Sequence, residues 1–487
     1  MDKKIIKNFL YNTGYQVLTL ILPFITIPYV SRIFNPEQIG IYSSTYSMVQ
    51  MFLIIGMFSV GSYGVKVIAA NRDDKEKLAK KFYEIRYMQK ITMIISIMLY
   101  FILFMTIDKN INKVIYIIQS INLIAGLIDI SWLFIGLEDF KKTVIRNVMV
   151  KIGSLGLIFI FVKKSSDLWL YTLILATSMF FGNLSMWRYL KEIININIDK
   201  SKNLKNNLIM AFSLLIPQIA FQIYTSFDRT ILGIVNSMEA VGMYDQSQKI
   251  IRMAVGIVTS LGIVMLPRIT NMISLNKNKQ DINELLRKSL NLTLFISLGC
   301  TFGILAISKN FVPWFYSEEY INVVLLLNIT SIVCVLTAVG SFFSNQYAIP
   351  NGNKKAYIIP LVSAAIISIL LTSILGSKFG AIGACISIVI TESAALALRM
   401  VFLKDELDYK YLFKDLYIFI IAGVSMFVFT KGLGYIFKFD ETILTTILEV
   451  IIGGSVYCLM IILLKREYIE YIRKFVFKTI KSKLHYS

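Results

Sequence analysis

The sequence is poor in the residues on which most catalytic and metal sites depend. Its 487 residues include one histidine, His485, and four cysteines that stand far apart inside apolar runs. It has no HExxH or GxSxG motif, no closely spaced cysteines and no GxxxxGK[ST] phosphate-binding loop. These absences argue against a zinc site, a disulfide framework, an ATPase and a hydrolase. We therefore expect no enzyme, no cofactor and no bound metal, and we interpret the cysteines as small buried hydrophobic residues.

Charged residues are also scarce, at 16%, whereas hydrophobic residues make up 56% and the mean hydropathy is +0.67. The apolar residues occur in unbroken runs rather than in the stripes typical of soluble helices. A bilayer core of about 30 Å requires about 20 apolar residues per helix. The runs therefore predict an all-α polytopic membrane protein. They lack the short alternating segments of a transmembrane β-barrel.

The apolar runs predict about fourteen membrane spans. The basic segment at residues 1–10 precedes a long run without a small-residue cleavage site, so we interpret that run as the first span rather than as a signal peptide. The spans are expected at residues 8–31, 40–63, 83–107, 113–136, 143–162, 168–188, 206–234, 242–267, 288–308, 321–349, 356–376, 380–402, 412–437 and 442–464.

The basic residues orient these spans. With the N-terminus inside, only about ten of the 50 Lys and Arg residues face the outer side, as the positive-inside rule requires. Both termini are then cytoplasmic, and the number of spans is even. The tail at 465–487 mixes basic and aromatic residues, which predicts an amphipathic helix on anionic membrane lipids. The net charge of +20 thus reflects membrane orientation, and we expect no nucleic-acid partner.

Two short motifs, "EQIGIY" and "EAVGMY", repeat one pattern far apart in the chain. The first follows the first predicted span and the second follows the seventh, both on the outer side. Since an odd-numbered span precedes each motif, the two six-span units have the same orientation. A second pair of similar segments supports the repeat: "WLFIGLEDFKK" ends span four and "QYAIPNGNKK" ends span ten. The shared residues of the motifs are Glu37, Gly40 and Tyr42 in the first copy and Glu239, Gly242 and Tyr244 in the second.

Physical chemistry gives each motif residue a structural role. Glu suits the positive end of a helix dipole, Gly permits a tight turn or a close helix approach, and Tyr suits the membrane interface. Parallel repeats are a known transporter plan, with substrate bound between the two halves. We interpret the motifs as the hinge turns of two lobes, which mark pseudo-symmetry and do not touch substrate.

Four segments together resemble a known family. "NPEQIGIYSSTYSM", "WLFIGLEDFKKTVIRN", "SFDRTILGIVNSMEAVGMYDQSQKI" and the proline-containing first span resemble the bacterial oligosaccharide flippases. These are the Wzx-type polysaccharide biosynthesis proteins of the multidrug/oligosaccharidyl-lipid/polysaccharide exporter superfamily. The resemblance covers most of the chain. It departs at Asn35, where Gly is common, and at Ile39, where an aromatic residue is common.

The resemblance implies two six-helix lobes around a central cavity, followed by two further helices. We expect an N-lobe at 1–200, a C-lobe at 201–405 and the added spans at 406–464. The implied function is to move an isoprenoid-pyrophosphate-linked oligosaccharide outward across the bacterial cytoplasmic membrane by alternating access. A glycan polymerase is a further expected partner.

Three alternatives stay open. They are a cation-coupled multidrug exporter of the same superfamily, a flippase for the lipid-linked peptidoglycan precursor and a membrane glycan polymerase. The short outer loops argue against the polymerase. Without an ATP-binding loop, transport can run on the membrane potential, because moving a charge of about −2 outward through 100 mV gains about 4–5 kcal/mol.

Charges inside predicted spans are functional hypotheses by default, because burying them in a bilayer is costly. Lys249 and Arg252 lie one helical turn apart on one face of span eight. Two cations on one face suit a pyrophosphate, which Arg can bind in bidentate fashion. Pairing with a carboxylate is the alternative. Lys66 and Arg86 flank the inner mouth, where they either attract the anionic substrate or serve only positive-inside orientation.

Other intramembrane charges suggest ion pairs, relays or a gate. Asp129 and Lys151 lie at similar depth, which predicts a buried ion pair or a proton or cation relay. Glu392 and Arg399 share a helix face in span twelve, so they are candidates for the same roles. Two adjacent charged residues, Asp228 and Arg229, end span seven at the outer side. They are either an exposed ion pair, which contributes little energy, or an outer gate.

Overall fold

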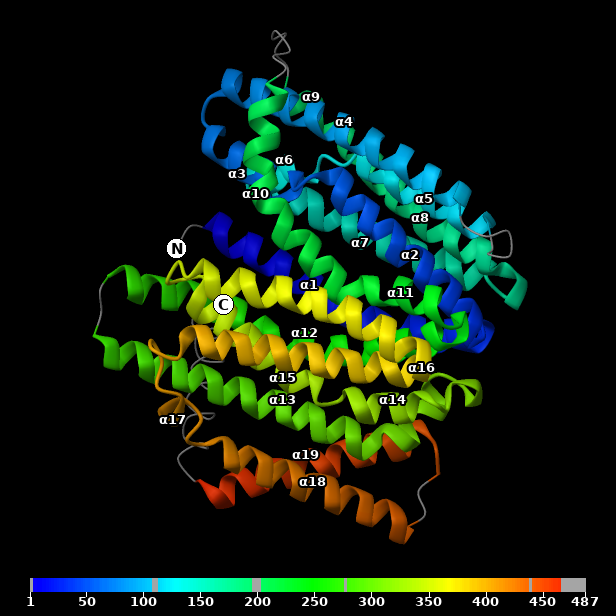
Figure 1. Ribbon diagram of the computed structural model, residues 1–487, viewed down its shortest axis with the longest axis vertical. Coiled ribbons are helices and arrows are strands. Elements are labelled where there is room, and N and C mark those ends of the chain that lie inside the picture. The colour runs from blue at the N-terminus through cyan, green and yellow to red at the C-terminus, as the bar shows by residue number, and fades with distance from the viewer. Residues whose placement is uncertain (1–2, 107–112, 195–202, 276–277, 438–439, 466–487) are drawn as a thin grey trace. The chain divides into compact units, whose positions relative to one another are not determined.

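The computed structural model describes residues 3–106, 113–194, 203–275, 278–437 and 440–465 (Figure 1). Over these ranges the chain is helical and contains no strand, so the predicted all-α fold is confirmed. Of the predicted amphipathic tail at 465–487, residues 466–487, which include His485, lie outside the described residues.

Helices of membrane-spanning length account for the predicted spans. Eleven segments of the described ranges are long and apolar enough to cross a bilayer. Two more long helices, α1 (Lys3–Ile33) and α12 (Met238–Ser274), coincide with predicted spans one and eight. One of the eleven, α16 (Lys354–Leu403), covers spans eleven and twelve together. With α1 and α12 added and α16 counted as two spans, the total is the predicted value of about fourteen.

The helix α16 is in fact two helical segments that meet at Gly380. The backbone there has φ 56° and ψ −131°, a conformation that favours glycine. A Cβ atom at Gly383 would lie 2.0 Å from the carbonyl oxygen of Leu375. Eight residues of continuous helix would rise about 12 Å, so the chain reverses between these positions. The break coincides with the predicted boundary between the two spans.

The chain divides into two compact units, and the first comprises Met1–Asp245 with Ala364–Ala384. In this unit α5 lies along α8, and α2 packs on α4 and α5 (Figure 1). Its core includes Trp132, whose ring stacks on Phe82 and contacts Gly64. Its helices are α1, α2 (Pro36–Met57), α3 (Val60–Asn71), α4 (Lys75–Thr106), α5 (Lys113–Leu127), α6 (Ser131–Gly136), α7 (Phe140–Phe161), α8 (Leu168–Ser185), α9 (Leu190–Ile193), α10 (Leu204–Gln222), α11 (Asp228–Val235), the start of α12 and the Ala364–Ala384 part of α16.

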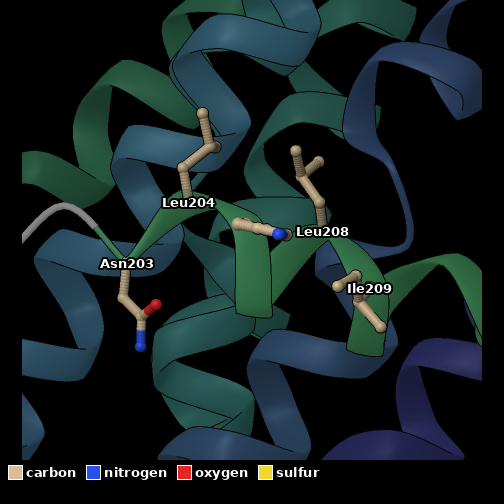
Figure 2. A pocket seen from close by; sticks show the side chains of 5 residues that line it. Asn203, Leu204, Leu208 and Ile209 are labelled. Atoms are coloured by element: carbon tan, nitrogen blue, oxygen red, sulfur yellow. The ribbon is translucent and has the colours of Figure 1, made fainter.

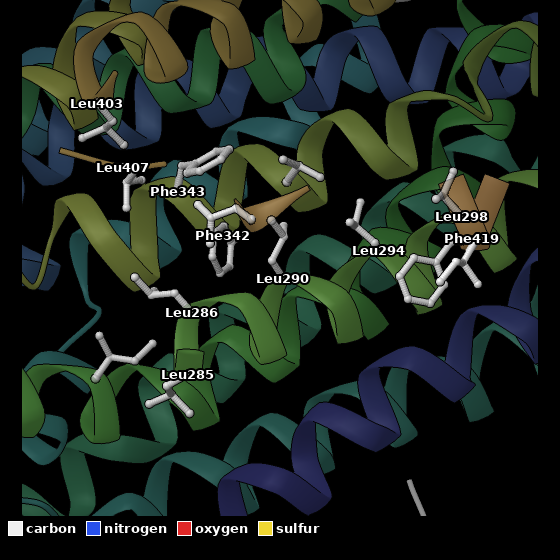
Figure 3. Packing of buried hydrophobic residues seen from close by; sticks show 14 of the residues in the cluster. Leu285, Leu286, Leu290, Leu294, Leu298, Phe342, Phe343, Leu403, Leu407 and Phe419 are labelled. Atoms are coloured by element: carbon white, nitrogen blue, oxygen red, sulfur yellow. The ribbon is translucent and has the colours of Figure 1, made fainter. Parts of the chain in front are cut away.

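The second unit comprises Gln246–Ser363 with Cys385–Ser487. Leucines at four-residue spacing on α13, including Leu286, Leu290 and Leu294, form one stripe of its core, which Figure 3 shows with Phe342 and Phe419. The helices α18 and α19 lie side by side along α13 (Figure 1). The further helices of this unit are α13 (Lys279–Phe315), α14 (Val323–Thr330), α15 (Val333–Ser341), α17 (Tyr409–Leu412), α18 (Leu416–Phe437) and α19 (Ile443–Leu464).

Candidate functional site

The two repeated motifs form the first turns of α2 and α12 rather than turns of their own. Asn35 caps α2: its side chain accepts a hydrogen bond from the Gln38 N–H at 2.9 Å, and Pro36 takes the first helical position. The Gln38 side chain in return accepts from the Asn35 N–H at 3.2 Å. The motif residues Glu37 and Glu239 are therefore helical and exposed. Their role as hinges stays a prediction.

The motif glycines bring the backbones of α2 and α12 into direct contact. A Cβ atom at Gly40 would lie 1.6 Å from the carbonyl oxygen of Met238, and one at Gly242 would lie 1.8 Å from that of Pro36. Since Pro36 and Met238 are themselves equivalent positions of the repeat, the contact is reciprocal. Small residues allow such close crossings of membrane helices. Of the two roles predicted for the glycines, close helix approach is the one observed.

Directly after each motif, two equivalent residues share a hydrogen bond. Ser43 Oγ donates to Asp245 Oδ2 at 2.8 Å, and the two residues are 202 positions apart. Arg229 Nε donates to the other carboxylate oxygen, Oδ1, at 2.5 Å. Ser43, Arg229 and Asp245 are only 4%, 4% and 5% exposed. Asp245 thus holds donors from both α2 and α11 inside the protein.

Asp228 completes this buried polar group. It accepts from the Arg229 guanidinium at 3.2 Å and from the Tyr244 hydroxyl at 2.5 Å. At 2% exposure Asp228 is buried, so the expectation of an exposed pair is wrong, whereas the outer gate stays a prediction. Tyr244 is fully buried too, which corrects its expected place at the membrane interface. We call Ser43, Asp228, Arg229, Tyr244 and Asp245 the Arg229 cluster.

A π-helical turn, Ile223–Phe227, positions the cluster. Such turns displace backbone carbonyl groups from regular helical bonding. Here the Ser226 carbonyl accepts from Ser47 Oγ at 2.5 Å, and the Arg229 guanidinium lies 3.4 Å from the same oxygen. On the next turn, Thr230 Oγ1 donates to the Ser44 carbonyl at 3.1 Å. The irregular backbone is therefore tied to α2 by serine and threonine side chains.

Aromatic rings border the cluster on α2 and α8. The ring of Tyr42 stacks on Tyr46 with centroids 5.8 Å apart, and it meets Tyr171 edge-on at 5.0 Å. Tyr42 and Tyr171 both lie close enough to Asp245 to interact with it electrostatically. The first-copy motif tyrosine therefore lies beside the acid that follows the second motif.

The predicted substrate cations fall into both units. Lys66 is exposed and Arg86 is half-buried in the first unit, where the Arg86 guanidinium lies 5.2 Å from the centroid of the Trp187 ring. In the second unit Lys249 is half-buried and Arg252 is exposed. Their contact with substrate stays a prediction.

Asp129 lies near a different cation from the one expected. Its carboxylate is 3.9 Å from Arg146 Nη1 and accepts from the Ser131 N–H at 2.8 Å. Arg146 also donates to Asn183 at 2.5 Å. Lys151 instead lies over the ring of Tyr15, 5.4 Å from its centroid. Among the described contacts, then, the structure brings Asp129 to Arg146 rather than to Lys151.

Glu392 and Arg399 are both buried in the second unit. A Cβ atom at Gly340 would lie 2.7 Å from Arg399 Nη1, so this glycine makes room for the guanidinium. Burial of both charges fits an ion pair or a relay, and either role stays a prediction.

Sequence reasoning missed several charged residues that the structure brings into contact. Asp245 could have been found, since it follows the second motif as Ser43 follows the first. Asp415 gives a weaker signal, directly before the apolar run of α18. It accepts from Arg287 and Lys465, each at 2.7 Å, and from Asn291 at 3.0 Å.

A hollow of about 580 Å³ lies beside the first turns of α10. Figure 2 shows the side chains that line it, and among these described lining residues Lys205 is the one cation. The lining comprises Asn203, Leu204, Lys205, Leu208 and Ile209. None of the predicted site residues is among them.

Sequence comparisons link the chain to polysaccharide export. A family model described as polysaccharide biosynthesis protein matches residues 5–273. The "Putative O-antigen transporter" of Escherichia coli (strain K12) is 24% identical over 405 residues, which cover 82% of this chain and 97% of that protein. The protein of the same name from Shigella dysenteriae is 24% identical over 408 residues, covering 80% of this chain and 97% of the relative.

A solved structure shares the fold. The "Lipid II flippase MurJ, inward closed conformation" superimposes with a TM-score of 0.74 at 16% identity, over 95% of this chain and all of that one. At this identity the likeness establishes the fold alone.

Proposed function

This chain belongs to the polysaccharide biosynthesis protein family, and on that premise we propose that it moves a lipid-linked oligosaccharide across the bacterial cytoplasmic membrane. The substrate is an isoprenoid pyrophosphate that carries a short glycan. The observation that carries the proposal is the family match, together with the O-antigen transporter relative, 97% of which aligns with this chain.

Transport proceeds by alternating access of two lobes, at 1–200 and 201–405, which the added spans at 406–464 follow in the chain. Support comes from the reciprocal contact of Gly40 and Gly242, because parallel repeats of this kind characterise transporters. Both termini face the cytoplasm, as the distribution of basic residues favours. A glycan polymerase and anionic lipids are the further partners, and the chain itself needs no catalytic step.

Substrate recognition depends on cations. Lys249 and Arg252 bind the pyrophosphate, because a guanidinium and an ammonium group on one helix face complement its charge. Lys66 and Arg86 attract the anion to the inner mouth. A hydrophobic cation would be repelled by the same residues, which disfavours a multidrug exporter.

Reconstitution tests the proposal directly. Purified protein in liposomes should translocate a fluorescent isoprenoid-pyrophosphate oligosaccharide, measured as its accessibility to an impermeant quencher. The double variant Lys249→Ala/Arg252→Ala should be at least about tenfold slower, since each charged contact is worth about 1.5–3 kcal/mol. The matched control is Lys354→Ala/Lys355→Ala, two exposed lysines, which should retain the wild-type rate.

Two further substrates separate the alternatives. Transport of a lipid-linked peptidoglycan precursor, with none of the oligosaccharide, would assign the chain to that pathway instead. Transport of a hydrophobic cationic dye, with none of the oligosaccharide, would support a multidrug exporter and contradict the proposal.

A further inference from the structure

The Arg229 cluster lies where the two repeats touch through buried polar groups. Ser43 on α2 and Asp245 on α12 follow directly after the glycine crossing and share a hydrogen bond of 2.8 Å. Any motion that separates the first turns of α2 and α12 must break this bond. The cluster is therefore a contact of the state in which the Gly40–Gly242 crossing is closed.

Ionised Asp245 favours that closed state. Its two oxygens accept from donors on different helices, Ser43 Oγ on α2 and Arg229 Nε on α11. Hydrogen bonds to a charged carboxylate are about twice as strong as neutral ones, and burial strengthens them further. A proton on Asp245 removes the negative charge and occupies one acceptor position, so it weakens both contacts.

The neighbouring groups leave Arg229 with a partner when Asp245 is protonated. Arg229 is shared between Asp245 and Asp228, so when Asp245 is neutral the guanidinium still has Asp228 as its partner. Two tyrosine hydroxyls also lie close enough to Asp245 to interact with it electrostatically, one from α2 and one from α8. Lys249 follows one turn later on α12. The tyrosines are Tyr42 and Tyr171.

We propose that Asp245 is a proton site that controls the separation of α2 from α12. Ionised Asp245 holds the crossing closed, and a proton taken from the outer solution favours opening. Because linkage is reciprocal, opening takes up a proton and closing releases it to water. The inference rests on the proposed function, which it deepens by naming the proton as the coupling ion for release at the outer face.

Accessibility of a residue inside the crossing reports opening. Met243 lies between Gly242 and Tyr244 and is 5% exposed, so Met243→Cys should react with an impermeant thiol reagent only when the helices separate. The native cysteines, Cys300, Cys334, Cys385 and Cys458, are replaced by Ser in this background. Because thiol reactivity itself depends on pH, rates are normalised to an exposed reporter, Ser166→Cys.

The normalised rate should rise at least about fivefold as pH falls from about 8 to about 5. Asp245→Asn should react fast at every pH, because a neutral side chain no longer holds the crossing closed. Ser43→Ala, which removes one hydrogen bond to Asp245, should react faster than wild type and keep the pH response. Asp245→Glu should also react faster than wild type, and it should keep the pH response because it retains a titratable carboxyl group. The control Glu239→Gln removes an exposed acid from the same helix and should behave as wild type.

If the normalised labelling rate of Asp245→Asn equals that of the wild type at every pH, Asp245 is not the proton site. The same follows if the pH response survives in Asp245→Asn and is lost in Glu239→Gln. Labelling needs no substrate, so this test is independent of the transport assay. Lack of oligosaccharide transport with an intact pH response would reject the proposed function alone, whereas transport without the pH response would reject only the proton site.

Discussion

Ser43 and Asp245 occupy the same position in two sequence repeats and are hydrogen-bonded to each other at 2.8 Å. A residue can contact its own repeat equivalent only near the axis that relates the repeats. The reciprocal contacts of Gly40 with Met238 and of Gly242 with Pro36 obey the same geometry. The motif therefore serves a second purpose besides starting a helix, because it forms the contact between the two copies of itself.

The closest part of this contact should tolerate no added side chain. Gly40→Ala places a Cβ atom 1.6 Å from the Met238 carbonyl oxygen, so the helices must move apart. We expect a loss of at least about 1–3 kcal/mol, the usual range for overpacking, measured as a lower midpoint of thermal unfolding in detergent. Gly61→Ala is the control, because a Cβ atom there meets nothing within 4 Å. Equal midpoints for the two variants would contradict the crossing.

Arg229 should be far more important for stability than an exposed arginine with a similar partner. Arg229→Met leaves Asp228 and Asp245 buried without the guanidinium that bridges them, which should cost about 3–5 kcal/mol. Arg72→Met breaks an ion pair with Glu138 at 2.6 Å whose side chains are 41% and 50% exposed. Solvent screens that pair, so its loss should be within the error of the measurement.

Both variants are compared by the free energy of unfolding in mixed detergent micelles. A similar loss for Arg229→Met and Arg72→Met would show that burial does not strengthen the cluster. Arg229→Lys gives an intermediate case, since an ammonium group keeps the charge but cannot reproduce the planar contact with two carboxylates.

Some features were predictable because they depend on local sequence. Long apolar runs located the helices, and the break in α16 at Gly380 coincides with the start of the second of two expected spans. The start of α2 was placed a few residues late, since the capping residues Asn35 and Pro36 extend the helix into the polar segment. Spacing alone also identified the two motifs that the structure brings together.

Pairing of charges was less predictable, because it depends on direction as well as depth. Counting residues placed Asp129 and Lys151 at one depth, but Arg146 is the nearer cation. Five residues on a helix correspond to about 7.5 Å and about 1.4 turns, so the two side chains point about 140° apart and depth does not select the partner. Likewise, the burial of Asp228 follows from packing of α11 on α2, which local sequence does not report.

Asp415 should hold α18 to α13 at one end of the second unit. Asp415→Ala removes the acceptor for Arg287 and Lys465, both at 2.7 Å, and leaves those cations without this carboxylate. Hydrogen exchange measured by mass spectrometry should become faster in the first turns of α18, with α2 unchanged. Glu441→Ala, which removes an exposed acid before α19, is the control. Unchanged exchange in α18 would show that apolar packing alone holds the helix there.

Gly380 should be the most sensitive of three glycines to substitution by alanine. Its backbone, at φ 56° and ψ −131°, is disfavoured for other residues, which costs about 1–3 kcal/mol. A Cβ atom there would also lie 3.2 Å from the Asn236 side chain, which donates to the Gly376 carbonyl at 3.0 Å. Gly352 has a positive φ of 68° but open space around it, so Gly352→Ala isolates the backbone effect.

Gly61→Ala has neither constraint and sets the baseline. Thermal unfolding midpoints should therefore fall in the order Gly61→Ala, Gly352→Ala, Gly380→Ala. If Gly380→Ala and Gly352→Ala lower the midpoint equally, the contact with Asn236 contributes nothing and the break in α16 depends on backbone conformation alone. If Gly380→Ala matches Gly61→Ala, the chain reversal between the two segments of α16 does not require glycine at all.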